Sequence, residues 1–178
     1  MSIMLLFSCP VYAAGIVINV QGEANGSITI DLFEDIAPNH TNRILKLSEE
    51  GLYDGVVFHR VIDGFMAQTG DVKFGNTNSS DYNLSLAGTG GSDLPNVKAE
   101  FTDIAHNRGT LSAARSADPD SANSQFFICF DSAPHLDRQY SAFGKVIKGM
   151  EFVDMIKKGD PSSGSVPDPD KIISLKSK

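Results

Sequence analysis

The chain has 178 residues and a mass of 19.1 kDa, which suits one domain with a sizeable hydrophobic core. Its formal net charge of −7 and its sequence pI of about 4.9 argue against nonspecific nucleic-acid binding, which needs a basic surface, and against docking onto anionic membranes. Sixteen glycines and eight prolines indicate many turns, and they favour β-structure with long loops over a helical bundle.

The first fourteen residues resemble the end of a secretory signal peptide. Residues 3–7 form an apolar run that is too short to span a bilayer, and small residues precede a cleavage position after Ala13. We therefore interpret residues 1–14 as a signal peptide and residues 15–178 as one domain, which predicts a periplasmic or secreted protein. Because no Lys or Arg precedes the apolar run, an N-terminal strand or a disordered tag on a cytoplasmic protein is the alternative. A lipidated Cys9 fits the sequence less well.

The next residues predict a hairpin followed by a helix. Two β-branched runs, 16–20 and 27–33, flank the dipeptide Asn25-Gly26, which is typical of a tight hairpin turn. Apolar and polar residues alternate in the second run, as in a half-buried strand. Residues 38–50 predict a helix, because proline suits its first turn and Gly51 offers a stop at its end.

The remainder of the chain predicts short strands, a long loop and a second helix. Residues 70–96 are rich in Gly, Asn and Ser and have no periodicity, which indicates a long surface loop that is functional or disordered. The second helix is expected over residues 150–157. Further strands are expected at 56–62, 65–68, 97–101, 109–114, 125–130, 143–147 and 172–175. About eight strands and two helices without a parallel βαβ rhythm favour an antiparallel barrel capped by helices.

Arg60 and Gln68 are the most informative residues, because they lie beside a Phe-Met pair in a strand-like stretch, residues 58–71, that otherwise looks buried. Polar groups in apolar surroundings need partners, and a ligand in a cleft can supply them. The Phe-rich run 125–130 could form the facing wall of such a cleft. The spacing alone leaves open a structural role in which Arg60 pairs with an acid such as Asp71.

Four motifs, which occur in order and extend over nearly everything after Ala14, resemble the cyclophilins, a family of peptidyl-prolyl cis-trans isomerases. They are FHRVIDGFMAQ at 58–68, RGTLSAAR at 108–115, SQFFI at 124–128 and FGKV at 143–146. The spelling ARSADP at 114–119 is similar to the bacterial branch. The resemblance implies a mainly β fold, a closed eight-stranded antiparallel β-barrel capped by two α-helices, with the active groove on its outer face.

By motif match, Arg60 resembles the catalytic arginine of the family, and Gln68 resembles the residue that holds the substrate backbone. Only one of two successive strand residues can face the groove, and the motif match chooses Phe126 for the proline pocket, with Phe127 in the core or the barrel wall. The substrate-binding residues that the resemblance implies are Phe65, Met66, Gln68, Ala114, Arg115, Gln125, Phe126, His135, Leu136 and Tyr140.

Two positions depart from the best-known eukaryotic pattern. His135 occupies a place where many cyclophilins carry a tryptophan that helps to bind cyclosporin, so cyclosporin is expected to bind weakly at most. Tyr140 occupies a place where a histidine often lies beside the proline pocket, which is a common bacterial choice. His59 points to the strand face opposite Arg60 and is interpreted as a structural histidine.

The resemblance implies that no metal and no cofactor take part, and the four histidines and two cysteines show no metal-ligand spacing. The expected partners are proline-containing peptides and unfolded or partly folded proteins, and the protein is expected to be a monomer. The main alternative is a cyclophilin-fold peptide-binding or chaperone module with little isomerase activity, although the retained Arg60 argues against it. A hydrolase is disfavoured because the chain has no GxSxG motif.

Overall fold

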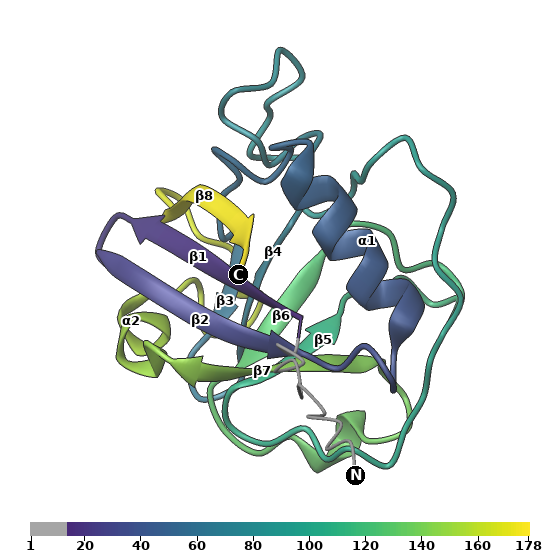
Figure 1. The fold of residues 1–178 in the computed structure, drawn as a ribbon. Helices are drawn as coiled ribbons and strands as arrows, with labels where there is room; N and C mark the ends of the chain where they lie inside the picture. The colour runs from purple at the N-terminus through teal and green to yellow at the C-terminus, as the bar shows by residue number, and fades with distance from the viewer. Residues whose placement is uncertain (1–13) are drawn as a thin grey trace, which may run out of the picture.

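The computed structural model of the protein describes residues 14–178. The expected cleavage position after Ala13 and Cys9 lie outside the described residues. The elements, in chain order, are β1 (Gly15–Gln21), β2 (Gly26–Leu32), α1 (Pro38–Glu49), β3 (Arg60–Ile62), β4 (Met66–Thr69), β5 (Thr110–Ala113), β6 (Phe126–Cys129), the 3-10 helix η1 (Pro134–Leu136), β7 (Ala142–Lys148), α2 (Met150–Met155) and β8 (Lys171–Ser177) (Figure 1).

The eight strands form one antiparallel sheet in the order β3-β4-β6-β5-β7-β2-β1-β8. Helix α1 packs against β7 and β8, and the short helix α2 packs against β2 (Figure 1). The mainly β fold with eight antiparallel strands and two helices is therefore confirmed. No helix within residues 14–178 has the length and the apolar character that crossing a membrane requires.

The prediction of a closed barrel is wrong, because the sheet is an open half-barrel. The two end strands, β3 and β8, share no hydrogen-bonded ladder. Strand β3 has only three residues, and the chain before it makes one isolated bridge to β8, between Val57 and Lys171. The free edge of β3 is instead covered by an irregular segment through the bridge between Arg60 and Ser165. A short edge strand covered by a loop is a usual way to protect a sheet edge without closing it.

The strand predicted at 97–101 is also wrong, because the structure has only an isolated bridge there, between Val97 and Ala122. The Glu100 side chain caps helix α1 instead. Its carboxylate accepts hydrogen bonds of 3.0 Å from the backbone N–H groups of Asn39 and His40. The helix has no capping side chain of its own, so a carboxylate from a distant loop satisfies its first free donors.

We expect Glu100→Gln to lower the free energy of unfolding by about 1 kcal/mol near neutral pH, the usual cost of a lost helix cap. Burial acts to raise the pKa of Glu100, but the hydrogen bonds from Asn39 and His40 outweigh it and hold the pKa below its usual value of 4.5. A carboxylate whose pKa is lower in the folded protein than in the unfolded chain stabilises the fold at pH values above its unfolded pKa. This contribution is lost as the pH falls through the folded-state pKa. Urea unfolding at neutral and acidic pH should therefore show the difference between the two proteins shrinking in acid. Glu34→Gln, at an exposed position, removes the same charge without a cap and serves as the control.

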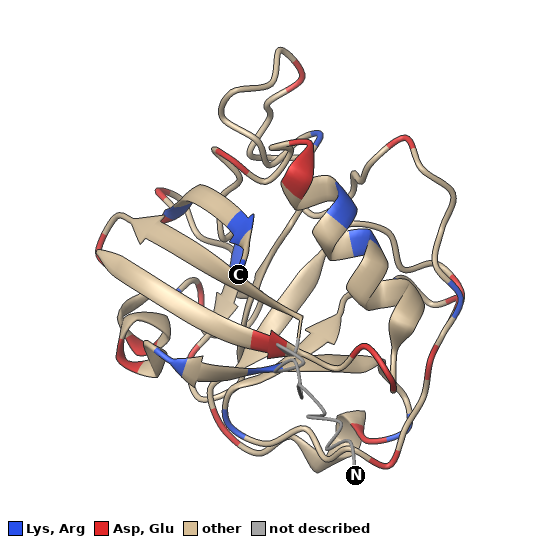
Figure 2. Cartoon of the chain, viewed as in Figure 1, with Lys and Arg blue, Asp and Glu red and all other residues tan. Residues whose placement is uncertain are grey.

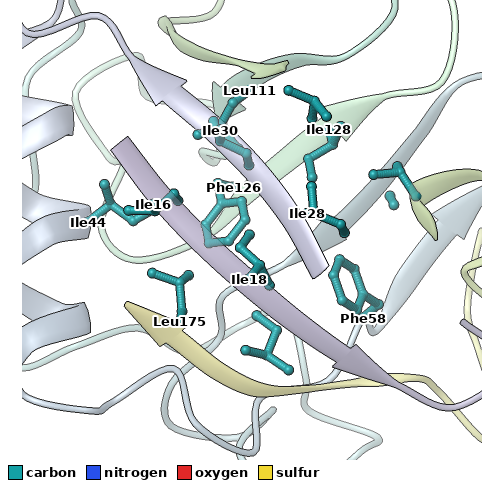
Figure 3. Packing of buried hydrophobic residues seen from close by; sticks show 14 of the residues in the cluster. Ile16, Ile18, Ile28, Ile30, Ile44, Phe58, Leu111, Phe126, Ile128 and Leu175 are labelled. Carbon is teal, nitrogen blue, oxygen red and sulfur yellow. The ribbon is translucent and has the colours of Figure 1, made fainter. Parts of the chain in front are cut away.

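The hydrophobic core lies between the inner face of the sheet and helix α1. The register of β1 and β2 pairs Ile16 with Ile30 and Ile18 with Ile28, so these four side chains share one face. Figure 3 shows them packed with residues from α1, from other strands and from the segment before β3: Ile44, Phe58, Leu111, Phe126, Ile128 and Leu175. All ten residues are at most 2% exposed. The predicted hairpin at 16–33 is confirmed, and it supplies one wall of this core.

Candidate active site

Strand β6 sends its two adjacent phenylalanines to opposite faces of the sheet. Phe126 pairs with Thr69 and Ala113 and joins the main core, where its ring meets the edge of Tyr53 at 5.7 Å. Phe127 pairs with Gln68 on β4 and lies on the outer face. The prediction that Phe126 lines the groove is therefore wrong, because Phe126 belongs to the core and Phe127 lines the groove instead. Alternation correctly required that only one ring face the groove, but the cross-strand register decides which one.

The outer face of strands β3, β4, β5 and β6 carries an open groove of about 300 Å³. It brings together all the residues predicted for the site except Gln125 and Phe126. Its lining residues are Arg60, Phe65, Met66, Gln68, Ala114, Arg115, Phe127, His135, Leu136 and Tyr140. A pocket of this size with an apolar floor and a few polar groups at its rim is typical of a ligand site.

Three polar side chains form a row along the edge of the groove. Arg60 on β3 lies opposite Gln68 on β4, and its Nη1 donates to Gln68 Oε1 at 3.4 Å. Gln68 Nε2 donates to Gln125 Oε1 at 3.0 Å. Gln125 Nε2 donates to the carbonyls of Gly88 and Gly90, which sets the orientation of the whole row. Gln125, predicted near the groove, therefore lies one step behind Gln68.

The hydrogen-bond partners of Arg60 include no carboxylate. Its Nε donates to the Ser163 carbonyl at 3.1 Å, and its Nη1 contacts Gln68 and the Met66 sulfur. Asp71 is buried and accepts from four backbone N–H groups, which organise the loop around it: those of Lys73, Phe74, Gly88 and Gly90. The alternative pairing of Arg60 with Asp71 is therefore absent, and the guanidinium remains available to a ligand.

The floor and the far wall of the groove are aromatic and apolar. Met66, Phe127 and Leu136 belong to one buried cluster, and Phe65 and Tyr140 pack against it. The Phe127 ring meets the Tyr140 ring edge-on at 5.9 Å. This floor can hold an apolar ring and exclude water from it.

Charged and aromatic residues form the rim. The Arg115 guanidinium lies over the Tyr140 ring at 4.4 Å and donates to the Gln139 carbonyl at 2.8 Å. The His135 ring is 5.3 Å from the Phe65 ring, and His135 is exposed. The helix η1, which the sequence did not predict, carries His135 and Leu136 to the groove. The Ala133-Pro134 pair at its start was the available signal, because proline suits a first helical turn.

A second, more polar groove of about 190 Å³ adjoins the first. The two share Gln68, Ala114 and Arg115. The residues that sequence reasoning missed here are Gly88, Thr89, Gly90, Ser116, Ser121 and Asn123. Three of them, Gly88, Thr89 and Gly90, belong to the long loop predicted over 70–96.

The turn formed by residues 160–165 packs against Arg60 and accepts a hydrogen bond from its guanidinium. Asp160 Oδ1 accepts hydrogen bonds from the backbone and hydroxyl groups of Ser162 and Ser163, which lower the pKa of Asp160 to about 2. The same turn presents the Ser163 carbonyl to Arg60 Nε. Gly164 has a φ of +79°, and a Cβ there would lie 2.9 Å from Arg60 Cγ. Glycine is therefore needed both for the backbone conformation and for the close approach of the arginine.

Because Arg60 is the predicted catalytic arginine, we expect Gly164→Ala to lower kcat/KM by roughly tenfold or more; a displacement of about 1 Å at such a group can cost about 10²-fold. Gly64→Ala is the matched control. Gly64 also has a positive φ, +70°, but a Cβ there would meet nothing within 4 Å. Both variants carry the same backbone strain, so only the first should lose activity beyond its loss of stability. Equal activity losses in the two variants would contradict a role of the turn in holding Arg60.

His59 does not line the apolar groove. It is 7% exposed, and burial lowers the pKa of its ring to about 4, so it is neutral at physiological pH. Across residues 14–178 there is no cluster of three or more potential metal ligands. The groups that the groove offers to a ligand are the Arg60 guanidinium, the row of side-chain amides and the apolar floor.

Comparison with known proteins gives one consistent result. The family model "Cyclophilin type peptidyl-prolyl cis-trans isomerase/CLD" matches residues 16–177. A protein of Brucella suis named "Probable peptidyl-prolyl cis-trans isomerase" is 53% identical over 150 residues, which are 84% of this chain and 76% of the relative. A peptidyl-prolyl cis-trans isomerase of Helicobacter pylori is 39% identical over 142 residues, which are 76% of this chain and 77% of the relative.

Solved structures agree with the sequence relatives. A cyclophilin-type isomerase of Cryptosporidium parvum, crystallised in the presence of the dipeptide Ala-Pro, has a TM-score of 0.74 and 28% identity, covering 91% of this chain and 97% of that one. A cyclophilin of Hirschia baltica has a TM-score of 0.73 and 26% identity, covering 90% of this chain and 72% of that one. The chain therefore belongs to the cyclophilin-type peptidyl-prolyl cis-trans isomerases and is an isomerase.

Proposed function

We propose that the groove at Arg60 catalyses rotation about X-Pro bonds in proline-containing peptides and in unfolded or partly folded proteins, and so assists their folding. The observation that carries this proposal is the position of the guanidinium. Arg60 lies at the edge of a groove of about 300 Å³ whose floor is apolar, and its contacts leave donors available. The Cryptosporidium structure obtained with Ala-Pro supports a proline-containing ligand.

The reaction requires stabilisation of a twisted amide and no bond making between heavy atoms. An amide C–N bond has partial double-bond character, with a rotation barrier of about 18–20 kcal/mol. Uncatalysed X-Pro isomerisation takes roughly tens to hundreds of seconds. A catalyst must therefore bind the twisted amide more tightly than either planar form. Because no bond between heavy atoms forms or breaks, this chemistry needs neither a nucleophile nor a redox group.

At the twisted geometry the prolyl nitrogen loses its conjugation and gains a lone pair that can accept a hydrogen bond. Arg60 is suited to donate this bond, because a guanidinium stays protonated at any working pH. The Ser163 carbonyl occupies its Nε and holds the side chain in place, so that the terminal N–H groups point toward the groove. A donor that is already oriented loses little entropy when the twisted amide forms.

The remaining groups hold the two sides of the bond differently. Phe65, Met66 and Phe127 would hold the proline ring and exclude the water that stabilises the planar amide. The hydrogen bond from Gln68 Nε2 to Gln125 fixes the orientation of the Gln68 amide. Because an amide can donate and accept at once, we assign Gln68 to the substrate backbone. Ala114 and Arg115 lie in both grooves, which suits contact with the residue that precedes proline.

A prolyl-isomerisation assay on an Ala-Pro tetrapeptide, coupled to a protease that cleaves only the trans form, tests the proposal. We expect fast catalysed conversion, and exchange spectroscopy should show cis and trans forms re-equilibrating without cleavage. Peptide binding without faster exchange would support the peptide-binding or chaperone alternative instead. Cyclosporin is expected to inhibit weakly at most, because the exposed His135 offers only a small ring at the rim.

We also propose that the protein acts as a periplasmic or secreted monomer. The signal-like composition of residues 1–14 supports export. Figure 2 shows basic residues dispersed among acidic ones on loops, on strands and along helix α1. Mass spectrometry of the exported protein, to find an N-terminus after Ala13, and sedimentation at micromolar concentration test these two points. A retained Cys9 or a stable dimer would contradict them.

A further inference from the structure

Three buried or half-buried polar residues form a chain behind the apolar floor of the groove. Asp137 Oδ1 is 3.1 Å from His106 Nδ1, and His106 Nε2 is 2.9 Å from Ser112 Oγ. His106 is 1% exposed and Ser112 is fully buried. None of the three lines either groove, so the proposed reaction does not use them directly.

His106 contacts Phe127 in the apolar floor of the groove and the two residues that flank helix η1. Its ring stacks on the Phe127 ring, with the centroids 6.4 Å apart and the planes inclined by 21°. Its backbone N–H donates to Asp137 Oδ1 at 2.7 Å, and its carbonyl accepts from the Ala133 N–H at 2.7 Å. Ala133 and Asp137 flank helix η1, which carries Leu136. His106 therefore joins the strand that carries Phe127 to the helix that carries Leu136.

Ser112 joins the same unit to strand β5. Ser112 pairs directly with Phe127 in the β5–β6 ladder. Its hydroxyl lies within hydrogen-bond distance of both His106 Nε2 and the Ser141 carbonyl, at 2.9 and 3.1 Å. When His106 is neutral, it donates from Nδ1 to Asp137 and accepts at Nε2 the single proton of the Ser112 hydroxyl; the Ser141 carbonyl then keeps the hydrogen bond from the Ala113 N–H. All the polar atoms of the chain then have partners, as a buried network requires.

Neutral His106 is the form expected at physiological pH. Burial lowers the pKa of its ring, and the hydrogen bond and charge of Asp137 oppose that shift only in part. The charged group that faces the His106 ring is Asp137. The titratable His135 lies on helix η1, and Arg138 follows Asp137 in the chain. Cys129 on β6 stays a thiol, because burial raises its pKa to about 12.

We propose that His106 is a positioning residue of the isomerase, which holds Phe127 and Leu136 at a fixed separation through the Asp137–His106–Ser112 chain. This proposal rests on the proposed function of the groove. The apolar floor grips the proline ring in the ground state and in the twisted state alike. Loosening the floor should therefore weaken binding throughout the reaction and raise KM more than it lowers kcat.

The test compares two buried histidines that have similar surroundings. We expect His106→Leu to raise KM for the tetrapeptide by about tenfold, with a smaller change in kcat. His40→Leu is the matched control, because His40 is also buried, contacts the carboxylate of Glu100 and has a neighbouring aromatic ring, Phe143, at 5.8 Å. Thermal unfolding should show both variants destabilised, but only His106→Leu should raise KM.

A second pair of variants does not depend on a buried substitution. Asp137→Asn keeps an oxygen that can accept from His106, so KM should stay close to that of the wild type, whereas Asp137→Ala should raise it. The ring signals of Phe127 in the NMR spectrum should shift in Asp137→Ala and stay in place in Asp137→Asn. A wild-type KM in folded His106→Leu and in Asp137→Ala, or an equal rise in His40→Leu, would overturn the proposal. If Arg60→Ala were fully active, the proposed function of the groove would fail instead.

Discussion

Arg60→Ala is expected to lower kcat/KM by roughly 10²- to 10³-fold, the usual cost of removing one oriented donor to a transition state. Most of the loss should appear in kcat, because the planar ground state of the amide does not need the hydrogen bond to the prolyl nitrogen. The fold should remain intact, since Arg60 is only half-buried and its partners are a carbonyl, an amide and a sulfur.

The measurement is the protease-coupled assay over a range of tetrapeptide concentrations, so that kcat and KM are separated. Arg60→Lys should recover little activity, because an ammonium group has a different reach and cannot be held through an Nε hydrogen bond. Arg108→Ala removes an exposed arginine paired with Asp154 and should leave the kinetics unchanged. A wild-type rate in Arg60→Ala would refute the catalytic assignment.

Phe127→Ala and Phe126→Ala are expected to impair different properties, although the two residues are adjacent: Phe126→Ala mainly stability and Phe127→Ala mainly activity. Phe126 is 1% exposed within the main core, so its truncation should lower the free energy of unfolding by about 3–5 kcal/mol. Phe127→Ala should cost less stability, because the space it leaves opens into the existing groove. Its loss should instead lower kcat/KM by roughly 10- to 100-fold, the value of burying one aromatic side chain.

Urea unfolding and tetrapeptide kinetics on the two variants, at a temperature where both are folded, provide the comparison. Each variant serves as the control for the other, since the same atoms are removed from neighbouring positions on one strand. A folded Phe126→Ala protein with impaired KM, beside an active Phe127→Ala protein, would reverse the assignment of the two rings.

The shift from Phe126 to Phe127 illustrates how far a motif can be interpreted without a structure. The sequence SQFFI specified a strand with one ring on each face, because successive strand residues alternate. It did not specify which face looks outward. That choice depends on the register with β4, which places Phe127 opposite Gln68 and Phe126 opposite Thr69. Register is a property of the paired strands, and no single strand contains it.

The helix cap and the positioning chain depend on contacts between distant segments. Glu100 caps α1 from 60 residues away, and this long-range contact is absent from the local sequence that led to the wrong prediction of a strand at 97–101. His106 had no signal above background in the sequence, and it becomes informative only when Asp137, Ser112 and Phe127 surround it. Local propensity is a weak guide wherever a side chain finds a strong partner far along the chain.

By itself, the sequence determined the mainly β class, the hairpin, the two helices, the membership of an isomerase family and most residues of the groove. Alternation, turn residues and motif spelling are local, and local patterns carry that information. Only the tertiary structure decided that the sheet stays open, that Phe127 faces the groove and that the Ser163 carbonyl holds Arg60. Each of these depends on which strand edges and side chains meet across the fold, and such long-range pairings are set by packing of the whole domain rather than by neighbouring residues.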